Sequence, residues 1–314
     1  MSLFQLREWW RHRQAGEEFG GAGAMCMARI RASSSVEHQI VTGSFSGQLR
    51  VFNPAHPDFS PAHVLLEHQL GEPILQVAFG RFHSSCDACV AVLHPRRLAL
   101  YQLVPPDAAS EDIPFLEVVH LASQLIPHSA ANMVFGAFGG KATALEGILV
   151  QALDGQVYLF EDGQQVHVTY LEDFLLPGPL LYLAETDQIV TCTSSFQLQA
   201  YSYSSIVQAS RVKAGADDSG SFGPAGHQGK APHPSWSRSI GEIALDLQLA
   251  PSDGRAKADV VVVGEHTILI CTQDGDVIDQ RRLEYHPSAA VSYRCVSHGV
   301  SRLVSCNNCC SRAR

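Results

Sequence analysis

The chain has 314 residues, of which 46% are hydrophobic and 17% charged, so it is a globular protein with length for one large or two average domains. Its net charge of -9 argues against a nucleic-acid partner, because neutralising phosphates requires a surface rich in Lys and Arg. The sequence contains neither a membrane-spanning apolar stretch nor a signal peptide, and its nine cysteines are scattered, so we expect a cytosolic protein with reduced thiols.

The first expected element is a short helix over residues 2–14, in which Leu3, Leu6, Trp9 and Trp10 fall on one side. Such a segment either covers the edge of a sheet or binds a partner. We prefer the first interpretation and expect residues 1–20 to pack on the domain that follows.

Five β-hairpins follow, each made of a short apolar run, a tight turn and a second, alternating run. The hairpins cover residues 40–52, 89–101, 147–160, 188–201 and 259–271, with turns at Gly47, Pro95, Gly155, Ser195 and His266. The Asp154-Gly155 and Asp274-Gly275 pairs are the strongest individual turn signals.

The spacing of these hairpins indicates an all-β fold of the β-propeller, WD40-like type. Their turns recur about every 40 to 70 positions, and propeller blades repeat roughly every 40 to 50 residues. A β-sandwich is the alternative, but sandwiches favour evenly spaced strands. The first run of a hairpin is apolar at consecutive positions, as at 148–150 and 260–263, which is typical of a strand covered on both faces.

Other segments are expected to be irregular. Residues 53–62 and 105–114 are proline-rich connections, and residues 213–239 form a disordered insertion rich in Gly, Ser and Pro. We therefore expect an incomplete propeller over residues 21–298 and a divergent, unstructured tail over 299–314.

Two cysteine groups have the internal spacing of zinc knuckles, namely Cys86 with Cys89, and Cys306 with Cys309 and Cys310. The groups lie far apart in the sequence, unlike the paired knuckles of zinc ribbons, so we prefer buried or free thiols over a structural zinc ion.

No other motif predicts catalysis. The 15 histidines do not cluster, and the Gly43 to Gly47 segment has Phe45 where a nucleophile elbow has serine. Residues 136–142 resemble a phosphate-binding loop only superficially, because the Gly-Lys-Ser/Thr spacing is missing. We therefore predict no catalytic, cofactor-binding or metal-binding residues and no cofactor.

Several segments resemble one known family. They include the opening Met1-Ser-Leu-Phe4, Arg7, Trp9-Trp10 and Glu17-Glu-Phe19, and the segments at 43–52, 75–77, 91–94, 132–140, 154–155, 174–180, 240–246 and 263–265. In order and spacing these segments are similar to the start of the parathyroid hormone-responsive B1 family, the Bardet-Biedl syndrome protein 9 subunits of the BBSome.

The resemblance implies a seven-bladed propeller, followed in full-length members by an ear-like β-domain and helical regions. It also implies a non-catalytic scaffold subunit in a coat-like complex that moves membrane proteins into and out of cilia. The implied partners are other BBSome subunits, with membrane contact only through the complex and no small-molecule substrate. The implied location is the cytoplasm, the ciliary base and the cilium.

Two alternatives stay open: a propeller adaptor that acts outside cilia, and a propeller hydrolase. The hydrolase requires Asp, Glu or His at equivalent strand starts, where this chain has Ile40, Val90, Ile148, Ile189 and Val260. The resemblance fades beyond about residue 298. We expect a truncated product with about five blades and a partial sixth, which would leave a strand within 276–296 unpaired and prone to capture a partner.

Overall fold

The structure of the chain is a computed structural model. The residues that it describes are 10–12, 18–19, 21–30, 38–54, 59–105, 115–140, 145–171, 178–210, 231–252, 257–287, 289–294 and 301–306. The chain divides into two compact units. Unit 1 comprises Met1–Ala130, Ala144–Glu146 and Glu161–Gln164, and unit 2 comprises Ala131–Thr143, Gly147–Phe160 and Gln165–Arg314.

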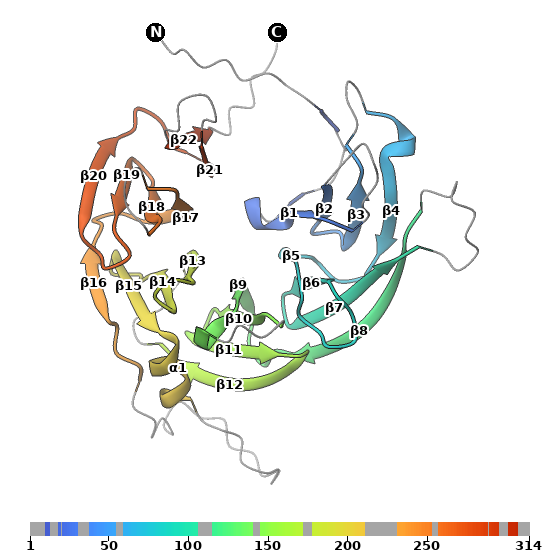
Figure 1. Ribbon diagram of the computed structural model, residues 1–314, viewed down its shortest axis with the longest axis horizontal. Coiled ribbons are helices and arrows are strands. Elements are labelled where there is room, and N and C mark those ends of the chain that lie inside the picture. Colours follow the sequence, from blue (N-terminus) through green and yellow to red (C-terminus); the bar gives the residue numbers. More distant parts are fainter. Residues whose placement is uncertain are drawn as a thin grey trace. The chain divides into compact units, whose positions relative to one another are not determined.

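Unit 1 contains two four-stranded antiparallel sheets, in which the strands pair in chain order (Figure 1). Their strands are β1 (Met25–Ala28), β2 (Gln39–Gly43), β3 (Gln48–Phe52) and β4 (Val64–Gln69), then β5 (Gln76–Gly80), β6 (Cys89–His94), β7 (Arg97–Val104) and β8 (Glu117–Leu125). Two short 3-10 helices accompany them, η1 (Ala22–Ala24) and η2 (Pro61–His63).

A third four-stranded sheet lies mostly in unit 2, although the turn between its last two strands belongs to unit 1. Its strands are β9 (Ala130–Gly136), β10 (Gly147–Ala152), β11 (Gln156–Glu161) and β12 (Gln164–Tyr170), with the 3-10 helix η3 (Phe138–Gly140) after β9.

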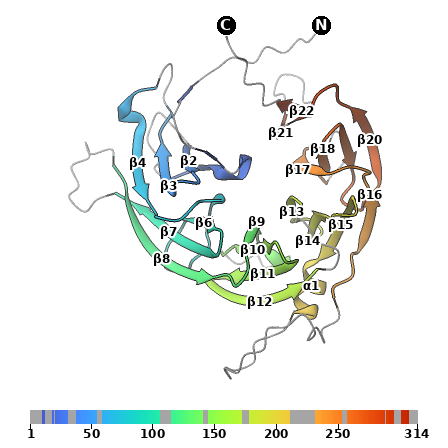
Figure 2. The same ribbon diagram turned by 180° about the vertical axis from the view of Figure 1, so that it is seen from behind.

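The rest of unit 2 holds two four-stranded sheets and a two-stranded sheet (Figure 2). The strands are β13 (Leu180–Leu183), β14 (Gln188–Cys192), β15 (Gln197–Ser202) and β16 (Trp236–Ser239), then β17 (Ala244–Ala250), β18 (Asp259–Gly264), β19 (Thr267–Cys271) and β20 (Val277–Arg282), and finally β21 (Ala289–Arg294) and β22 (Ser301–Cys306).

Burial within a sheet explains why these sequences form strands. In β6, β10 and β18 all six residues are buried, because the second strand of a meander is covered on both faces. The outer strand β20 has no buried residue, and its sequence is correspondingly polar. Four-stranded antiparallel meanders in succession have the topology of propeller blades, as predicted, while the number of blades stays a prediction.

One backbone hydrogen bond recurs in all five four-stranded sheets. The N–H of an apolar residue just after the outer strand donates to the carbonyl of the turn between the second and third strands. These bonds, 2.6 to 3.0 Å long, join Leu70 to Gly47, Ile126 to Arg96, Leu171 to Gly155, Ile240 to Phe196 and Leu283 to His266. This recurring hydrogen bond therefore fixes the path by which the chain leaves each sheet.

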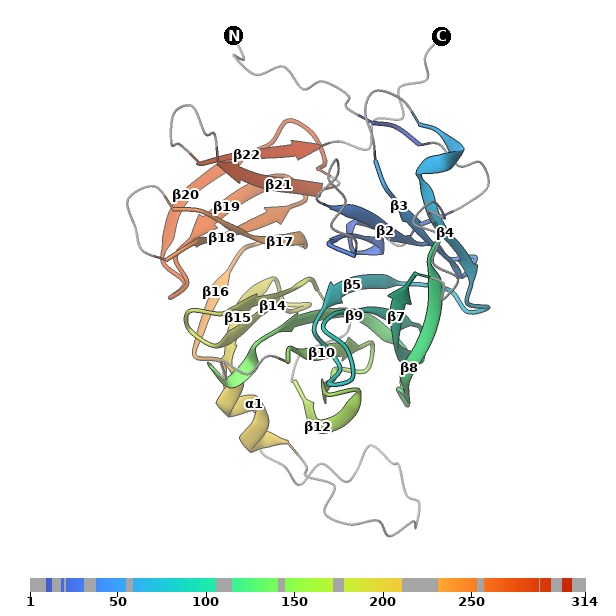
Figure 3. The same cartoon turned by 45° about the vertical axis from the view of Figure 1, so that its right-hand side comes forward.

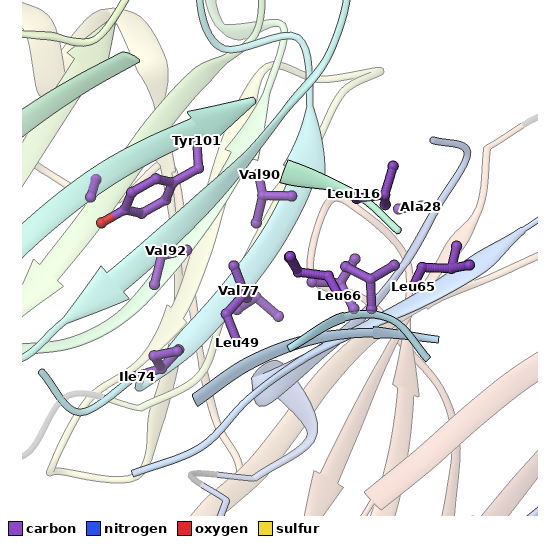
Figure 4. Packing of buried hydrophobic residues seen from close by; sticks show 13 residues of the cluster. Ala28, Leu49, Leu65, Leu66, Ile74, Val77, Val90, Val92, Tyr101 and Leu116 are labelled. Atoms are coloured by element: carbon purple, nitrogen blue, oxygen red, sulfur yellow. The ribbon is translucent and has the colours of Figure 1, made fainter. Parts of the chain in front are cut away.

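The core of unit 1 lies between its two sheets (Figure 4). Leu49 and Leu66 of the first sheet belong to one buried cluster with Val77, Val90 and Val92 of the second. Branched apolar side chains from facing strands thereby bury the surfaces that each sheet would otherwise expose to water.

Three expectations from the sequence need correction or lie outside the described residues. Trp236–Ser239, expected in a disordered insertion, forms β16, because it pairs with β15 and the Trp236 indole N–H donates to the Gln273 carbonyl at 2.9 Å. Residues 213–230 of that insertion lie outside the described residues. The helix expected over 2–14 does so too, apart from Trp10 to His12, which form no helix.

The C-terminal region also differs from the expectation. Ser301–Cys306 forms β22 and pairs with β21, so residues 301–306 are not an unstructured tail. In the stretch 276–296, expected to leave a strand unpaired, β20 pairs with β19 and β21 with β22. The sequence also failed to predict α1 (Tyr203–Ala209), which directly follows β15 (Figure 3). No helix in the described part of the chain is long and apolar enough to cross a membrane.

Candidate interaction surface

The first cysteine group singled out in the sequence is buried. Cys86 and Cys89 are both buried and unpaired as disulfides, and burial raises the pKa of Cys89 to about 12. Burial likewise raises the pKa of Cys192 to about 12. Such thiols are almost entirely protonated at neutral pH and are weak nucleophiles and weak metal ligands.

The second cysteine group is only partly visible. Cys306 lies in β22, whereas Cys309 and Cys310 lie outside the described residues. Within the ranges that the structure describes, no three His, Cys, Asp or Glu side chains are grouped so that they could hold a metal ion.

The glycine-rich segment at 136–140 has a structural role. Phe138 packs edge-to-face on Tyr182 and stacks on Tyr203, with ring centroids 4.7 and 5.7 Å apart. The carboxylate of Asp187 accepts hydrogen bonds from the Gly139 N–H and the Tyr182 hydroxyl, both at 2.9 Å. The segment therefore ties η3 to the neighbouring sheet and to α1.

Some exposed apolar side chains lie near the same end of their own sheet. We call this the turn end, because it carries the turn between the second and third strands of each sheet. The exposed residues there are Phe45 and Leu125 in unit 1, and Leu153, Tyr170, Phe196, Ile243 and Tyr285 in unit 2. An exposed apolar side chain of this kind is a candidate for contact with another protein where it is part of a contiguous patch.

Two turns at this end have the same construction. In residues 44–47 and 193–196, the hydroxyl of Ser44 or Thr193 lies 2.8 Å from a serine hydroxyl two residues on. The same hydroxyl accepts from the backbone N–H four residues on, at 3.3 Å in both turns. The fourth residue of each turn has a left-handed backbone, with φ of 85° at Gly47 and 59° at Phe196.

Phe196 thus occupies a position that favours glycine. A left-handed backbone costs a non-glycine residue about 1–2 kcal/mol. Asp162 and Asp187 also have positive φ, but the carboxylate of each accepts two hydrogen bonds. The phenyl ring of Phe196 has no polar group and remains 41% exposed, so neither hydrogen bonds nor full burial offset its strain.

A second exposed apolar residue, Ile243, lies just before β17. Ile240, whose N–H donates to the Phe196 carbonyl, begins the connection to β17, and Ile243 in this connection is 51% exposed. Sequence reasoning identified neither residue as functional. The comparison of Ser-Phe-Ser-Gly-Gln at 44–48 with Thr-Ser-Ser-Phe-Gln at 193–197 was the available signal.

Comparisons with known proteins identify the family. Residues 1–308 match the family model described as PTHB1 N-terminal. The chain belongs to this family. It is 32% identical to Protein PTHB1 of Xenopus laevis over 315 residues and 32% identical to Protein PTHB1 of Homo sapiens over 319 residues, in both cases across 98% of the chain. The chain spans 36% and 35% of the length of these relatives, or about a third.

Solved structures support the fold. The crystal structure of BBS1N in complex with ARL6DN is similar with a TM-score of 0.53 and 12% identity, over 88% of this chain and 86% of that one. Saccharomyces cerevisiae Sqt1 is similar with a TM-score of 0.59 and 7% identity, over 89% of this chain and 69% of that one. At such identities the likeness concerns the fold alone, and together with the meander sheets it confirms the predicted all-β propeller class.

Proposed function

We propose that this PTHB1-family chain is a non-catalytic scaffold subunit of the BBSome, which carries membrane proteins to and from cilia. The observation that carries this proposal is the family match over residues 1–308, combined with exposed apolar side chains at the turn end. The chain then acts through other BBSome subunits, in the cytoplasm and at the ciliary base, and meets membranes only through the complex.

The chemistry of the buried thiols argues against catalysis by a cysteine nucleophile. Burial raises the pKa of Cys26, Cys89 and Cys192 to about 12, so these side chains supply little thiolate for nucleophilic attack. A polar residue in a catalytic site normally has its pKa shifted towards the working pH.

The test is affinity purification of the tagged chain from ciliated cells, followed by identification of the proteins that copurify. Recovery of BBSome subunits and enrichment of the chain at the ciliary base are the expected results. Recovery of other proteins without any BBSome subunit, from a folded chain, would contradict the proposal and favour an adaptor outside cilia.

A further inference from the structure

We propose that acid releases the N-terminal strap of unit 1, residues 10–12, and that the ring of His63 is the switch. Release uncovers the aromatic surface on which the strap lies. This regulation goes beyond the proposed scaffold function and is independent of it, because every contact involved lies within unit 1.

The strap lies on two phenylalanine rings. The Trp10 ring centroid is 5.6 Å from that of Phe52 and 5.9 Å from that of Phe59. The His12 ring centroid is 5.1 Å and 4.2 Å from the same two rings. These contacts help to bury Phe52, which is 4% exposed, so release of the strap brings aromatic surface into water.

A single nitrogen atom, Nδ1 of His63, accepts two hydrogen bonds. The Trp10 indole N–H donates to it at 3.4 Å and the Ser60 backbone N–H at 3.1 Å. Indole and amide N–H groups can only donate, so Nδ1 carries no proton in this arrangement. The ring is therefore neutral, with its one proton on Nε2, and the next proton that it takes up must bind at Nδ1.

Protonation of Nδ1 removes both hydrogen bonds at once. The N–H formed there faces two other N–H groups, which are left without an acceptor. The Ser60 bond is also half of the capping box of η2, whose other half is supplied by the Ser60 hydroxyl. Protonation therefore loosens both the attachment of Trp10 and the turn next to Phe59.

Neighbouring charges do not compensate for this loss. Among the described residues of the strap, η2, β3 and β4, the other titratable or charged side chains are Arg11, His12, Arg50, Glu67 and His68. The Glu67 carboxylate is paired with the Arg50 guanidinium at 2.7 Å. His68 pairs in register with Leu49, on the face of the sheet opposite to Phe52. The one carboxylate of this set is thus already engaged, and Arg11 adds a positive charge to the strap.

His12 responds to acid in the opposite sense. Its ring centroid lies 4.2 Å from that of Phe59 with 32° between the planes, so a protonated His12 gains a cation–π contact. Acid therefore strengthens this contact while it breaks those of His63. Substitutions can separate the two histidines.

The test uses the purified full chain, labelled with 5-fluorotryptophan and followed by fluorine NMR as the pH is lowered. The chain has three tryptophans, and the Trp10 signal is the one absent from the Trp10→Phe variant. A histidine usually takes up its proton at about pH 6.5, so at about pH 5.5 the ratio of docked to released strap should fall about tenfold. The Trp10 signal should then move to its position in urea, while an unchanged Trp236 signal and an unchanged circular dichroism spectrum show that the fold persists.

Two variants assign the effect to one histidine. In His63→Asn the side-chain oxygen takes the place of Nδ1 and accepts hydrogen bonds at every pH, so the Trp10 signal should keep its docked position on acidification. His12→Phe keeps a ring against Phe59 but takes up no proton, and it should release the strap as the native chain does.

Two results would overturn the proposal. The first is a Trp10 signal of the native chain that stays in place while the His63 ring, followed by carbon NMR, takes up its proton. The second is a release on acidification that proceeds unchanged in His63→Asn. Neither result bears on the recovery of BBSome subunits with the chain, so the proposed scaffold function stands or falls separately.

Discussion

Replacing Gly275 by alanine should destabilise unit 2 more than a comparable change elsewhere. Gly275 lies in the β19–β20 turn with φ of 88°, and an added Cβ would lie 2.7 Å from Trp236 Cε3 and 2.8 Å from Cδ2. Trp236 is held in place, because its indole N–H donates to the Gln273 carbonyl. The ring therefore has little freedom to move away.

The magnitude follows from three contributions. The left-handed backbone costs alanine about 1–2 kcal/mol, and the stiffer unfolded chain returns about 0.4–1 kcal/mol. Overpacking against Trp236 adds about 1–3 kcal/mol. We expect a total loss of about 2–4 kcal/mol in the free energy of unfolding.

Gly241 provides the matched control, because its φ is 75° and an added Cβ would meet no atom within 4 Å. Gly241→Ala should therefore cost only about 1 kcal/mol, the net backbone contribution. The measurement is urea denaturation of both variants and of Gly275→Ala combined with Trp236→Leu, which should show coupling. Equal losses in Gly275→Ala and Gly241→Ala would refute the clash with Trp236.

Three further predictions concern buried polar groups and thiols. Burial is the main cause that raises the pKa of Asp246 above its unfolded value of 3.8. The charged carboxylate therefore destabilises the fold above the raised pKa, and this cost disappears as the pH falls towards 3.8. Asp246→Asn should raise the thermal midpoint at pH 7, and the difference from the native chain should shrink at pH 4.5. Glu67→Gln should lower the free energy of unfolding, measured by urea denaturation, by about 1 kcal/mol. The reason is that the buried guanidinium of Arg50 donates to the Glu67 carboxylate at 2.7 and 2.9 Å. A loss that did not become smaller in high salt would contradict an ionic origin. In the native chain at pH 8, Cys89 and Cys192 should react with a thiol reagent far more slowly than after unfolding, and serine variants of both should leave the fast-reacting fraction unchanged.

The inner hairpins were predictable because burial on both faces leaves a strong mark on the sequence. Val260 to Val263 are four consecutive valines, and all four are buried in β18. The outer strands carry no such mark. β20 has no buried residue and reads Val-Ile-Asp-Gln-Arg-Arg. Its strand conformation therefore depends on pairing with β19, a tertiary contact that no local pattern encodes.

Short elements were missed for a related reason. β16 has four residues and α1 has seven, too few for hydrophobic periodicity to appear. β16 is held by pairing with β15 and by contacts of Trp236 with the 273–276 turn, which is distant in the sequence. The helix begins at Ser202, whose hydroxyl accepts from the Ser205 N–H, a capping signal that the sequence does contain.

At the turn end, the residues that make the recurring backbone hydrogen bond differ from Phe196 in how their side chains suit the fold. Each four-stranded meander must return its chain past the turn, and the residue that does so, such as Leu70 or Ile240, donates the recurring backbone hydrogen bond. The side chains of Leu70 and Ile240 also pack against buried clusters, so apolar residues suit these positions. Phe196 is different, because the fold uses only its carbonyl and would be less strained with glycine. The matching turn of unit 1 avoids this strain by having Gly47, with φ of 85°, at the same position.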